Sequence, residues 1–356
     1  MRDGAKYSGA AHQLTTLALT VLAALLLAAP ATALAAEGEF SPTREFPDTW
    51  DRIGVFADQL PSLSVAQRKF AASHYAGTQK QTSNLIDAIR VYNPDFLMLQ
   101  YRLGTRESGH SASYIHNNSW SNDWAYIDSN PDWFIGHWGT NPDPRVYQFY
   151  AGWLKEYCMD VSGNISGNTT NGWKEYFSTT VINDINASHG DGVFADSTHL
   201  PYAVPADQYA SPLGSPPHTA LIPHLEIFYD YVYQQYTAAN MYFIPNIGSL
   251  VTTIDTTSGY YEDVHGAMIE GFAVTRYGFT DWRMQANRTL RLVNNDKILI
   301  AQNGVSSASD VAGRMWYLTN YMLVKRERSF VNILGAGTQM HWWPEYDIDL
   351  GAPAST

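Results

Sequence analysis

Two carboxylates stand at the ends of apolar runs, where they could act together in a reaction. The run 192–195 ends in Asp196, and the run 267–269 ends in Glu270. One further apolar run, 241–246, lies between them. If the three runs are consecutive strands of a barrel, the carboxylates lie on strands n and n+2 and can face each other across its mouth. Such a pair can hydrolyse a glycosidic bond, because one group protonates the leaving oxygen while the other attacks the anomeric carbon or activates water.

Each carboxylate also has a structural interpretation. Asp196 could cap the turn that follows it, and Glu270 could pair with an arginine such as Arg276. We favour catalysis because several other apolar runs also end in polar residues. A strand end that needed only a turn would more often carry Gly, Ser or Asn.

The other polar strand ends are candidates for substrate contacts. They are Gln100 and Tyr101, Asp160, Asn246, and Gln302 with Asn303. His199 joins this set because it follows Asp196 by three residues, although a loop histidine more often bonds to backbone groups. Binding and catalytic groups of a barrel gather at the carboxyl ends of its strands, so we expect these side chains to surround the substrate.

Aromatic residues are abundant, with 23 Tyr, 14 Phe and 11 Trp, or 13% of the 356 residues. Trp342, Trp343 and Glu345 follow the last predicted strand and should lie on the same rim. Trp rings stack on the apolar faces of sugars, while neighbouring acids and amides bind their hydroxyls. The segment 119–138 has a similar mix of Trp, Tyr and Asp. Packing of loops against the barrel is the alternative for some of these tryptophans.

Short apolar runs alternate with helical patterns along the chain. Nine runs are strand candidates: 52–57, 75–78, 96–101, 157–160, 192–196, 241–246, 267–270, 297–302 and 330–334. The helical patterns span 65–73, 82–91, 172–187, 218–238, 280–294 and 310–327. This alternation, with runs apolar on both faces, indicates a parallel sheet covered by helices.

Eight of the nine strands would close a (β/α)8 TIM barrel, so either 75–78 or 157–160 is surplus. A doubly wound open sheet is the alternative. It is weakened because no Gly-x-Gly-x-x-Gly or phosphate-binding loop follows an early strand. The long stretch 103–152 and the Pro-rich loop 201–217 are insertions that we expect to wall the cleft.

The N-terminus has the pattern of a secretory signal peptide. Arg2 and Lys6 precede an uncharged apolar run at 14–29, and small residues follow at 31–36. A membrane anchor is the alternative, but a span needs roughly 20 apolar residues, and the small residues favour cleavage. We therefore predict a signal peptide at 1–36, a single catalytic domain at 37–356, and a secreted protein free of the membrane after cleavage.

Charge and cysteine content exclude several classes of function. The 22 basic and 34 acidic residues leave a formal net charge of −12, which argues against nucleic acid or an anionic membrane surface as a partner. Cys158 is the single cysteine, so no internal disulfide forms, and we expect it to be buried packing. The histidines form no H-x-H or H-E-x-x-H motif, so we expect no metal and no cofactor. The oligomeric state is not readable from the sequence.

Three segments together resemble a known family. DGVFADSTH at 191–199, MIEGF at 268–272 and HWWPEYDIDLG at 341–351 resemble the glycoside hydrolase-like barrels called hypothetical glycosyl hydrolase family fifteen. A more distant likeness is to the endo-α-1,4-polygalactosaminidases. The resemblance covers about 46–351. It implies a (β/α)8 fold, hydrolysis of a polysaccharide, Asp196 as the nucleophile and Glu270 as the acid/base, with Asp160 in contact with substrate.

The sequence therefore predicts a secreted glycoside hydrolase that acts on an extracellular polysaccharide or oligosaccharide by a two-carboxylate mechanism. A carbohydrate-binding barrel without turnover is the first alternative, and a metal-dependent deacetylase is the second. A carboxyl separation much larger than about 5–9.5 Å, or a carboxylate buried against an arginine, would favour binding alone.

Overall fold

The structure is a computed structural model of the 356-residue chain. It describes residues 40–80, 83–108, 123–136, 145–150, 154–198, 221–248, 250, 262–274, 278–335 and 340–352, with the backbone alone for 148–150 and 154–155. The described residues all belong to the compact unit Phe40–Thr356. The predicted signal peptide at 1–36 lies outside them.

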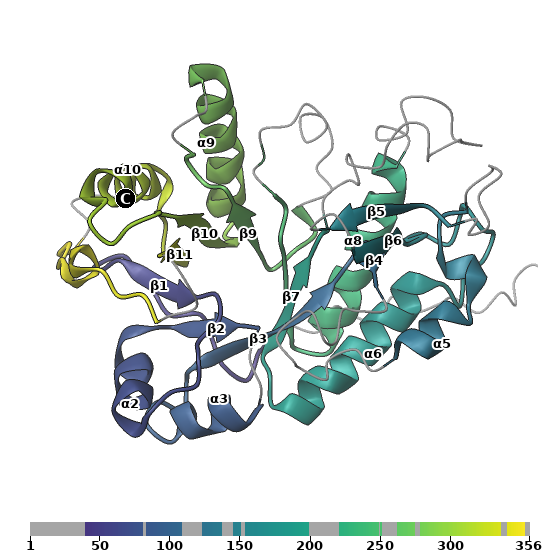
Figure 1. Ribbon diagram of the computed structural model, residues 1–356, viewed down its shortest axis with the longest axis horizontal. Helices are drawn as coiled ribbons and strands as arrows, with labels where there is room; N and C mark the ends of the chain where they lie inside the picture. The colour runs from purple at the N-terminus through teal and green to yellow at the C-terminus, as the bar shows by residue number, and fades with distance from the viewer. Residues whose placement is uncertain are drawn as a thin grey trace, which may run out of the picture. The chain divides into compact units, whose positions relative to one another are not determined.

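Eight parallel strands form the central sheet (Figure 1). They are β1 (Gly54–Ala57), β2 (Gly77–Gln79), β3 (Leu97–Leu103), β7 (Gly192–Asp196), β8 (Tyr242–Pro245), β9 (Gly266–Glu270), β10 (Ile298–Gly304) and β11 (Ser329–Leu334). Their order is β8-β7-β3-β2-β1-β11-β10-β9. A parallel bridge between Asn246 and Met268 joins the two ends, and the Ile247 N–H donates to the Met268 carbonyl at 3.1 Å. The sheet is therefore a nearly closed barrel, and the predicted (β/α)8 fold is confirmed.

Helices follow the strands and cover the outer face of the barrel. They are α2 (Val65–His74), α3 (Ser83–Arg90), α6 (Trp173–Ser188), α8 (Ile222–Ala238), α9 (Phe279–Asn294) and α10 (Val311–Val324). Ser64 begins α2 with a capping box, in which Ser64 and Gln67 bond to each other's backbone N–H, a common start signal. None of the helices in these ranges is long and apolar enough to cross a membrane.

Part of the long stretch after β3 folds into a second, antiparallel sheet. Its strands are β4 (Arg106–Glu107), β5 (Tyr147–Tyr150) and β6 (Leu154–Cys158), in the order β4-β6-β5. A short helix, α5 (Trp124–Asp128), and a 3-10 turn, η1 (Pro131–Trp133), lie between β4 and β5. The surplus strand of the sequence pattern is therefore 157–160, and 75–78 overlaps the barrel strand β2.

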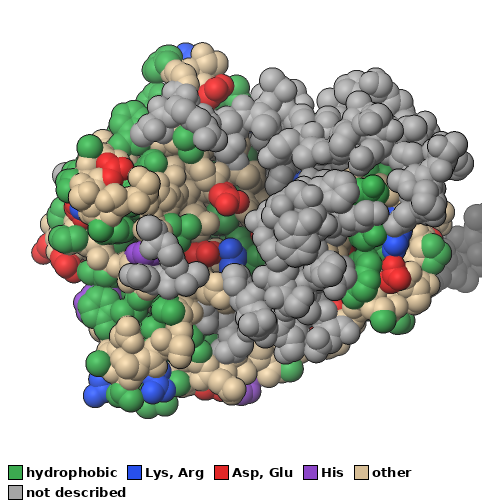
Figure 2. Space-filling view, in the orientation of Figure 1, with side chains coloured by type: hydrophobic (Ala, Val, Ile, Leu, Met, Phe, Trp, Pro, Cys, Tyr) green, Lys and Arg blue, Asp and Glu red, His purple; other side chains and the backbone are tan. Residues whose placement is uncertain are grey.

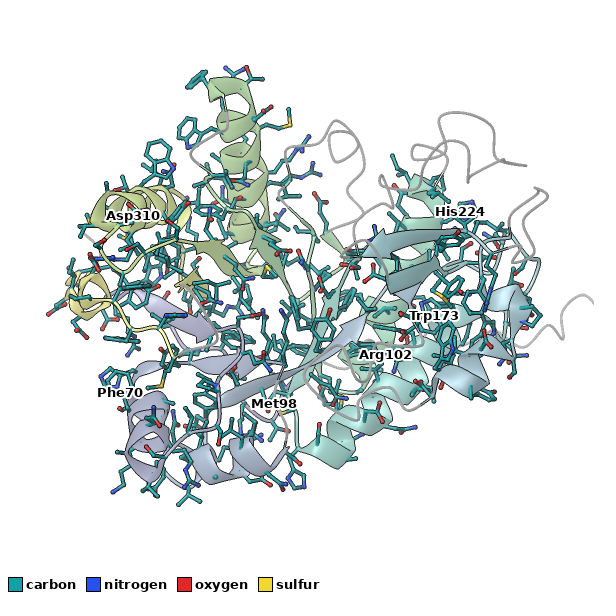
Figure 3. All side chains as sticks on the ribbon, viewed as in Figure 1. Phe70, Met98, Arg102, Trp173, His224 and Asp310 are labelled. Atoms are coloured by element: carbon teal, nitrogen blue, oxygen red, sulfur yellow. The ribbon has the colours of Figure 1, made fainter. Side chains whose placement is uncertain are left out.

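Arg102 ties this antiparallel sheet to the barrel. The side chain leaves β3 on its outer face, beside the ring of Trp173 on α6 (Figure 3). Its guanidinium lies 2.7 Å from Glu107 on β4 and 3.1 Å from Asp123 before α5. Because Arg102 and Glu107 are both buried, breaking this cluster would leave a charge without its partner in the interior.

The barrel interior is filled by aromatic and aliphatic side chains from alternate strand positions. Its members are Phe46, Phe56, Leu97, Leu99, Tyr101, Leu103, Phe194, Tyr242, Ile244, Met268, Ile298, Ile300 and Phe330. Phe46 precedes β1 and contacts the rings of Phe56, Tyr242 and Phe330 at centroid distances of 4.9–5.4 Å. The intervening residues of the strands face the helices. The core is therefore two-layered, which explains why the strands are apolar on both faces.

Asp191, the residue before β7, is part of the closed end of the barrel. Its carboxylate lies 2.9 Å from Arg44 and 2.7 Å from Arg90, and it accepts the Met98 N–H at 2.8 Å. Burial raises the pKa of Asp191 despite the two guanidinium groups. It stands at the amino end of its strand, opposite to Asp196, so its role is structural.

We expect Gly192→Ala to destabilise the barrel. A Cβ at this position would lie 2.3 Å from the Tyr242 carbonyl oxygen and 2.7 Å from its nitrogen, so backbone atoms of β8 would have to move. Overpacking of this kind costs about 1–3 kcal/mol, which thermal unfolding would register as a lower Tm. Gly136→Ala is the control, because nothing lies within 4 Å of its added Cβ. Equal Tm values for the two variants would contradict this packing.

Candidate active site

Each of the eight barrel strands places one polar side chain at its carboxyl end. In order around the barrel they are Asn246, Asp196, Tyr101, Gln79, Asp58, Asn332, Gln302 and Glu270. Side chains of a strand alternate between its two faces. Each of these residues lies an even number of positions from an inward-facing residue of its strand, so each points to the barrel interior. Near the middle of the face shown in Figure 2, acidic and basic side chains lie next to each other. These eight residues form the mouth ring.

Asn246 joins the two predicted catalytic carboxylates. Its side-chain amide nitrogen donates to Asp196 Oδ1 at 2.8 Å and to Glu270 Oε2 at 2.9 Å. The two oxygens therefore lie at most the sum of these distances, about 5.7 Å, apart. β8 carries Asn246 between β7 and β9, so the geometry follows directly from the strand order.

Hydrogen bonds and a nearby ammonium hold Asp196 in its ionised form. The Tyr101 hydroxyl donates to Oδ2 at 2.6 Å, and the Ser197 N–H donates to Oδ1 at 2.8 Å. Burial alone would raise the pKa of this carboxyl. The Lys80 ammonium and the hydrogen bonds from Tyr101, Asn246 and Ser197 outweigh burial, so the pKa is lowered from its usual value. Asp196 is therefore a carboxylate at neutral pH.

Lys80 supplies the positive charge at the mouth. Its Nζ lies 2.8 Å from Asp58 Oδ1 and 5.3 Å from the ring centroids of Tyr101 and Phe194. Burial would lower the pKa of Lys80, but Asp58 and Asp196 raise it above its usual value. One ammonium thus serves two carboxylates on different strands.

Left-handed backbone turns follow several of the same strand ends, although others precede strands at the opposite end of the barrel. Lys80 after β2, Ser197 after β7 and Ala273 after β9 have positive φ angles of 61°, 53° and 51°. Gly248 and Gly271, after β8 and β9, have φ angles of 67° and 72°. Residues held in the left-handed region cost free energy and cluster at functional sites. These turns change the chain direction directly after the polar side chains of β2, β7, β8 and β9.

Glu270 differs from Asp196 in its exposure. Its side chain is exposed, whereas Asp196 is half-buried. Gln302 pairs in register with Glu270 on the neighbouring strand β10, and Asn246 bonds to its Oε2. An exposed carboxyl can exchange protons with water, and a half-buried one held by three donors can keep a fixed position, so the two groups suit different roles.

A comparison with protein families identifies the family of the chain. The family model described as hypothetical glycosyl hydrolase family 15 matches residues 90–356. The chain belongs to that family. The matched region contains β7, β8 and β9 and the residues Asp196, Asn246 and Glu270 at their ends. No curated protein sequence matches the chain.

Solved structures with a similar fold include several glycoside hydrolases. The glycoside hydrolase domain of PelA from Pseudomonas aeruginosa shares 9% identity, with 84% of this chain and 97% of that chain covered and a TM-score of 0.47. The GH18 chitinase ChiB of Flavobacterium johnsoniae also shares 9% identity, with 84% and 92% covered and a TM-score of 0.42. At 9% identity, these similarities assign neither catalytic residues nor a substrate to the present protein.

Two of the predicted substrate contacts lie away from the mouth ring. Gln100 faces the helix layer, where Ser188 of α6 donates to its Oε1 at 2.8 Å, because Tyr101 beside it occupies the inward position. Asp160 follows β6, outside the barrel, and is fully buried. Its carboxylate accepts from residues 162–166, including the Ser166 N–H at 2.7 Å, so it holds a turn. Both predictions are therefore corrected to structural roles.

The tail residues after β11 are engaged by the protein itself. Trp342 packs against Phe70, His74 and Tyr75, and Trp343 is buried, with its Nε1 donating to the Ile333 carbonyl at 2.9 Å. Neither indole presents an open face to the mouth ring. The prediction that the two tryptophans bind substrate is therefore replaced by a packing role.

Glu345 is likewise bound within the fold. It lies in the 3-10 turn η4 (Pro344–Asp347) and accepts from Arg314 of α10 at 2.9–3.3 Å. The hydrogen bonds from Arg314 lower the pKa of the Glu345 carboxyl. This pair holds η4 to α10, so Glu345 is a structural residue.

The other candidates have mixed outcomes. Tyr101, Asn246 and Gln302 stand in the mouth ring, and their contact with substrate stays a prediction. Cys158 is buried, and burial raises the pKa of its thiol to about 11. His199, Arg276, residues 119–122 and the loop 201–217 lie outside the described residues. Within the described ranges, no group of three His, Cys, Asp or Glu side chains could hold a metal ion.

The sequence argument missed Asp58, Gln79, Lys80 and Asn332. One signal for Asp58 is present in the chain: the pentapeptide Gly-Val-Phe-Ala-Asp occurs at 54–58 and again at 192–196. In both copies the glycine and the phenylalanine face the barrel interior, so the aspartate does too. Lys80 carries no such signal, because its position depends on a left-handed turn that the sequence does not announce.

We expect Lys80→Met to move the acid limb of the kcat/KM profile to higher pH. Lys80 lowers the pKa of Asp196, and only the ionised carboxylate can act as a nucleophile. Removing the ammonium raises that pKa, so activity is lost earlier as the pH falls. The measurement is a pH–rate profile on any substrate that the protein hydrolyses. Lys69→Met, on the exposed face of α2, should leave the limb in place. An unshifted limb for Lys80→Met would separate this residue from the chemistry.

Proposed function

We propose that the protein is a secreted glycoside hydrolase that cleaves an extracellular polysaccharide or oligosaccharide with Asp196 and Glu270. The observation that carries the proposal is the Asn246 amide, which donates to both carboxylates. It sets two carboxyl groups within reach of one glycosidic bond, at the end of a barrel where catalytic residues of this fold lie. Membership of a glycosyl hydrolase family supports the same reaction class.

The two environments assign the roles. Asp196 is the nucleophile, because Tyr101, Asn246 and Ser197 fix its position and Lys80 keeps it ionised. Glu270 is the acid/base, because it is the other carboxyl group that Asn246 contacts and because its side chain is exposed to the solvent that supplies the attacking water. In the first step Glu270 protonates the leaving oxygen while Asp196 bonds to the anomeric carbon. In the second step Glu270 removes a proton from water, and the water oxygen displaces Asp196.

The charges balance through this cycle. Before reaction Asp196 is anionic and Glu270 is protonated, and in the covalent intermediate Asp196 is an ester and Glu270 is anionic. Asn246 donates to both groups, so it can support the negative charge on either side. Lys80 stays within electrostatic reach of both carboxylates.

A carbohydrate-binding barrel without turnover fits the geometry less well. That alternative predicts carboxyl groups set far apart, or one of them buried against an arginine. The bridge through Asn246 brings the oxygens within about 5.7 Å, and Asp196 is held by a tyrosine, an amide and a backbone N–H rather than by an arginine. Secretion and the cleavage of a signal peptide at 1–36 rest on the sequence pattern alone.

We expect Asp196→Asn and Glu270→Gln each to lower product release from the cleaved glycan by roughly 10²-fold or more, as for acid/base groups. The measurement is reducing-sugar release from a panel of bacterial and fungal polysaccharides by the protein without residues 1–36. Asp95→Asn and Glu226→Gln are matched controls on exposed carboxylates and should keep full activity. Equal product from wild type and both site variants would refute the assigned pair.

We also expect the product to retain the anomeric configuration of the substrate. Retaining pairs have carboxyl groups roughly 5–5.5 Å apart and inverting pairs roughly 6.5–9.5 Å, and the bridge holds the nearest oxygens within about 5.7 Å. Proton NMR of the first-formed reducing sugar distinguishes the outcomes before mutarotation mixes the anomers. An inverted first product would mean that Asp196 activates a water molecule instead of attacking the sugar.

A further inference from the structure

A cavity lined by polar and apolar side chains opens at the carboxyl ends of β1 and β11, on the side of the barrel mouth that the strand order places opposite Asn246. Its volume is about 180 Å³, and its walls include Asp58, Leu60, Tyr75, Asn332, Gly335 and His341. At about 30 Å³ for each water molecule, this space equals roughly six waters. It is suited in size to one sugar ring rather than to an oligosaccharide.

Two chains of contacts connect the cavity to the catalytic carboxylates. On one side, Asp58 bonds to Lys80 at 2.8 Å, and Lys80 acts electrostatically on Asp196. On the other side, the Asn332 amide donates to Gln302 Oε1 at 2.9 Å, and Gln302 pairs in register with Glu270. The cavity therefore belongs to the same mouth as the two carboxylates and is linked to each of them through one intervening side chain.

Asp58 offers one open acceptor to this cavity. Its Oδ1 is occupied by Lys80 and by the Gln79 amide at 2.7 Å. Its backbone carbonyl accepts the Gln79 N–H at 3.1 Å, which fixes the residue at the end of β1. Among the described residues no donor contacts Oδ2, and the side chain is 17% exposed. A rigid carboxylate oxygen without a protein partner is available for a hydroxyl group.

Asn332 offers a second acceptor. Its amide nitrogen is used by Gln302, whereas no donor from the described part of the chain reaches its carbonyl oxygen. The residue is 6% exposed and lies on a strand that hydrogen-bonds on both sides, to β1 and β10. The strand pairing and the bond to Gln302 restrict the side chain of Asn332, which lines the cavity, so little ordering of this residue is needed on binding.

The outer wall of the cavity is also fixed. The Tyr75 hydroxyl donates to the His341 carbonyl at 2.6 Å, and the His341 ring stacks on Trp343 at 5.8 Å with 6° between the planes. A Cβ on Gly335 would lie 2.6 Å from that ring, so only glycine allows the imidazole to lie there. A preformed pocket with apolar walls and a few polar groups is typical of small-ligand sites.

We propose that this cavity is a subsite that holds one sugar ring of the substrate, with two of its hydroxyl groups donating to Asp58 Oδ2 and to the Asn332 carbonyl oxygen. The proposal rests on the proposed hydrolase function for the name of its ligand. It adds Asp58 and Asn332 as the residues that select the sugar, and it explains why Asp58 stands in a copy of the strand sequence that carries Asp196.

The test measures sugar binding in the absence of turnover. D-glucose, D-galactose, N-acetyl-D-glucosamine and D-galactosamine are titrated into the Asp196→Asn protein and followed by ligand-observed NMR. The same titrations are made after adding Asp58→Asn or Asn332→Leu. Asp95→Asn is the matched control, since it neutralises an exposed carboxylate that lines a cavity at the opposite end of the barrel. Thermal unfolding confirms that each variant folds, and the two site substitutions test the cavity independently.

We expect at least one of these sugars to bind and its affinity to fall roughly tenfold or more in each site variant, as for the loss of a hydrogen bond to a rigid polar partner, with no change in the control. Binding of equal strength in all variants would place the sugar elsewhere and overturn the proposal. No binding of any of the four would overturn it as well. Because binding is measured without turnover, a failure of the hydrolase proposal is seen separately, in the activities of Asp196→Asn and Glu270→Gln.

Discussion

Two carboxyl groups at the barrel mouth are held close together, and their separation determines how readily both can be charged. If both were ionised, oxygens at most about 5.7 Å apart would repel each other by about 3 kcal/mol or more at an effective dielectric constant of about 20, and by less where water reaches the exposed Glu270. Asn246 donates one N–H to each carboxylate, and Lys80 lies between Asp196 and Asp58. The proposed chemistry uses this arrangement: the more strongly held group, Asp196, stays ionised, and Glu270 is the second carboxyl group beside it.

The barrel supplies these positions through strand order and alternation. Asn246 can reach both carboxylates because β8 lies between β7 and β9, with Asn246 itself making the bridge that brings the sheet round to β9. The interior below is a solid core, with Phe46 packed against Phe56, Tyr242 and Phe330. A rigid core fixes the strand ends, so the residues above it are held without needing flexible loops to position them.

The sequence pattern was sufficient for the fold and for placing Asp196 and Glu270 at neighbouring positions of the barrel mouth, but not for which other side chains face them. Strands of a parallel barrel are apolar on both sides, so a polar residue at a strand end can point to the mouth or to the helices. Gln100 and Tyr101 show the ambiguity, since only the second faces inward. Asp160 was misplaced because β6 has the composition of a barrel strand and yet pairs antiparallel with β4 and β5. Trp342 and Trp343 were misplaced because stacking on a sugar and packing on a helix require the same side chain.

Small residues would have resolved part of this ambiguity. Gly54, Gly192 and Gly266 face inward at the starts of their strands, where an added Cβ would meet neighbouring side chains or backbone within 3 Å. Asp58, Asp196 and Glu270 each follow one of these glycines by four residues, so the period of two assigns all three carboxylates to the interior face. A glycine at the start of a strand and an acid at its end therefore identify a mouth residue without a structure.

The two copies of Gly-Val-Phe-Ala-Asp show why identical strands can serve different purposes. In β7 the aspartate accepts hydrogen bonds from Tyr101 on β3 and from Asn246 after β8. Asn246 also donates to Glu270, so the Asp196 carboxylate lies close to that second carboxyl group. The aspartate that follows β1, Asp58, contacts Gln79 on β2 and Lys80 after it. On the opposite flank of β1, Asn332 on β11 donates to Gln302, so its carbonyl oxygen offers an acceptor and not a donor. Five identical residues thus give a group suited to attack on one strand and a group suited to binding hydroxyls on another. The difference lies entirely in the adjacent strands, which is why the roles depend on the closed order of the barrel and not on the pentapeptide.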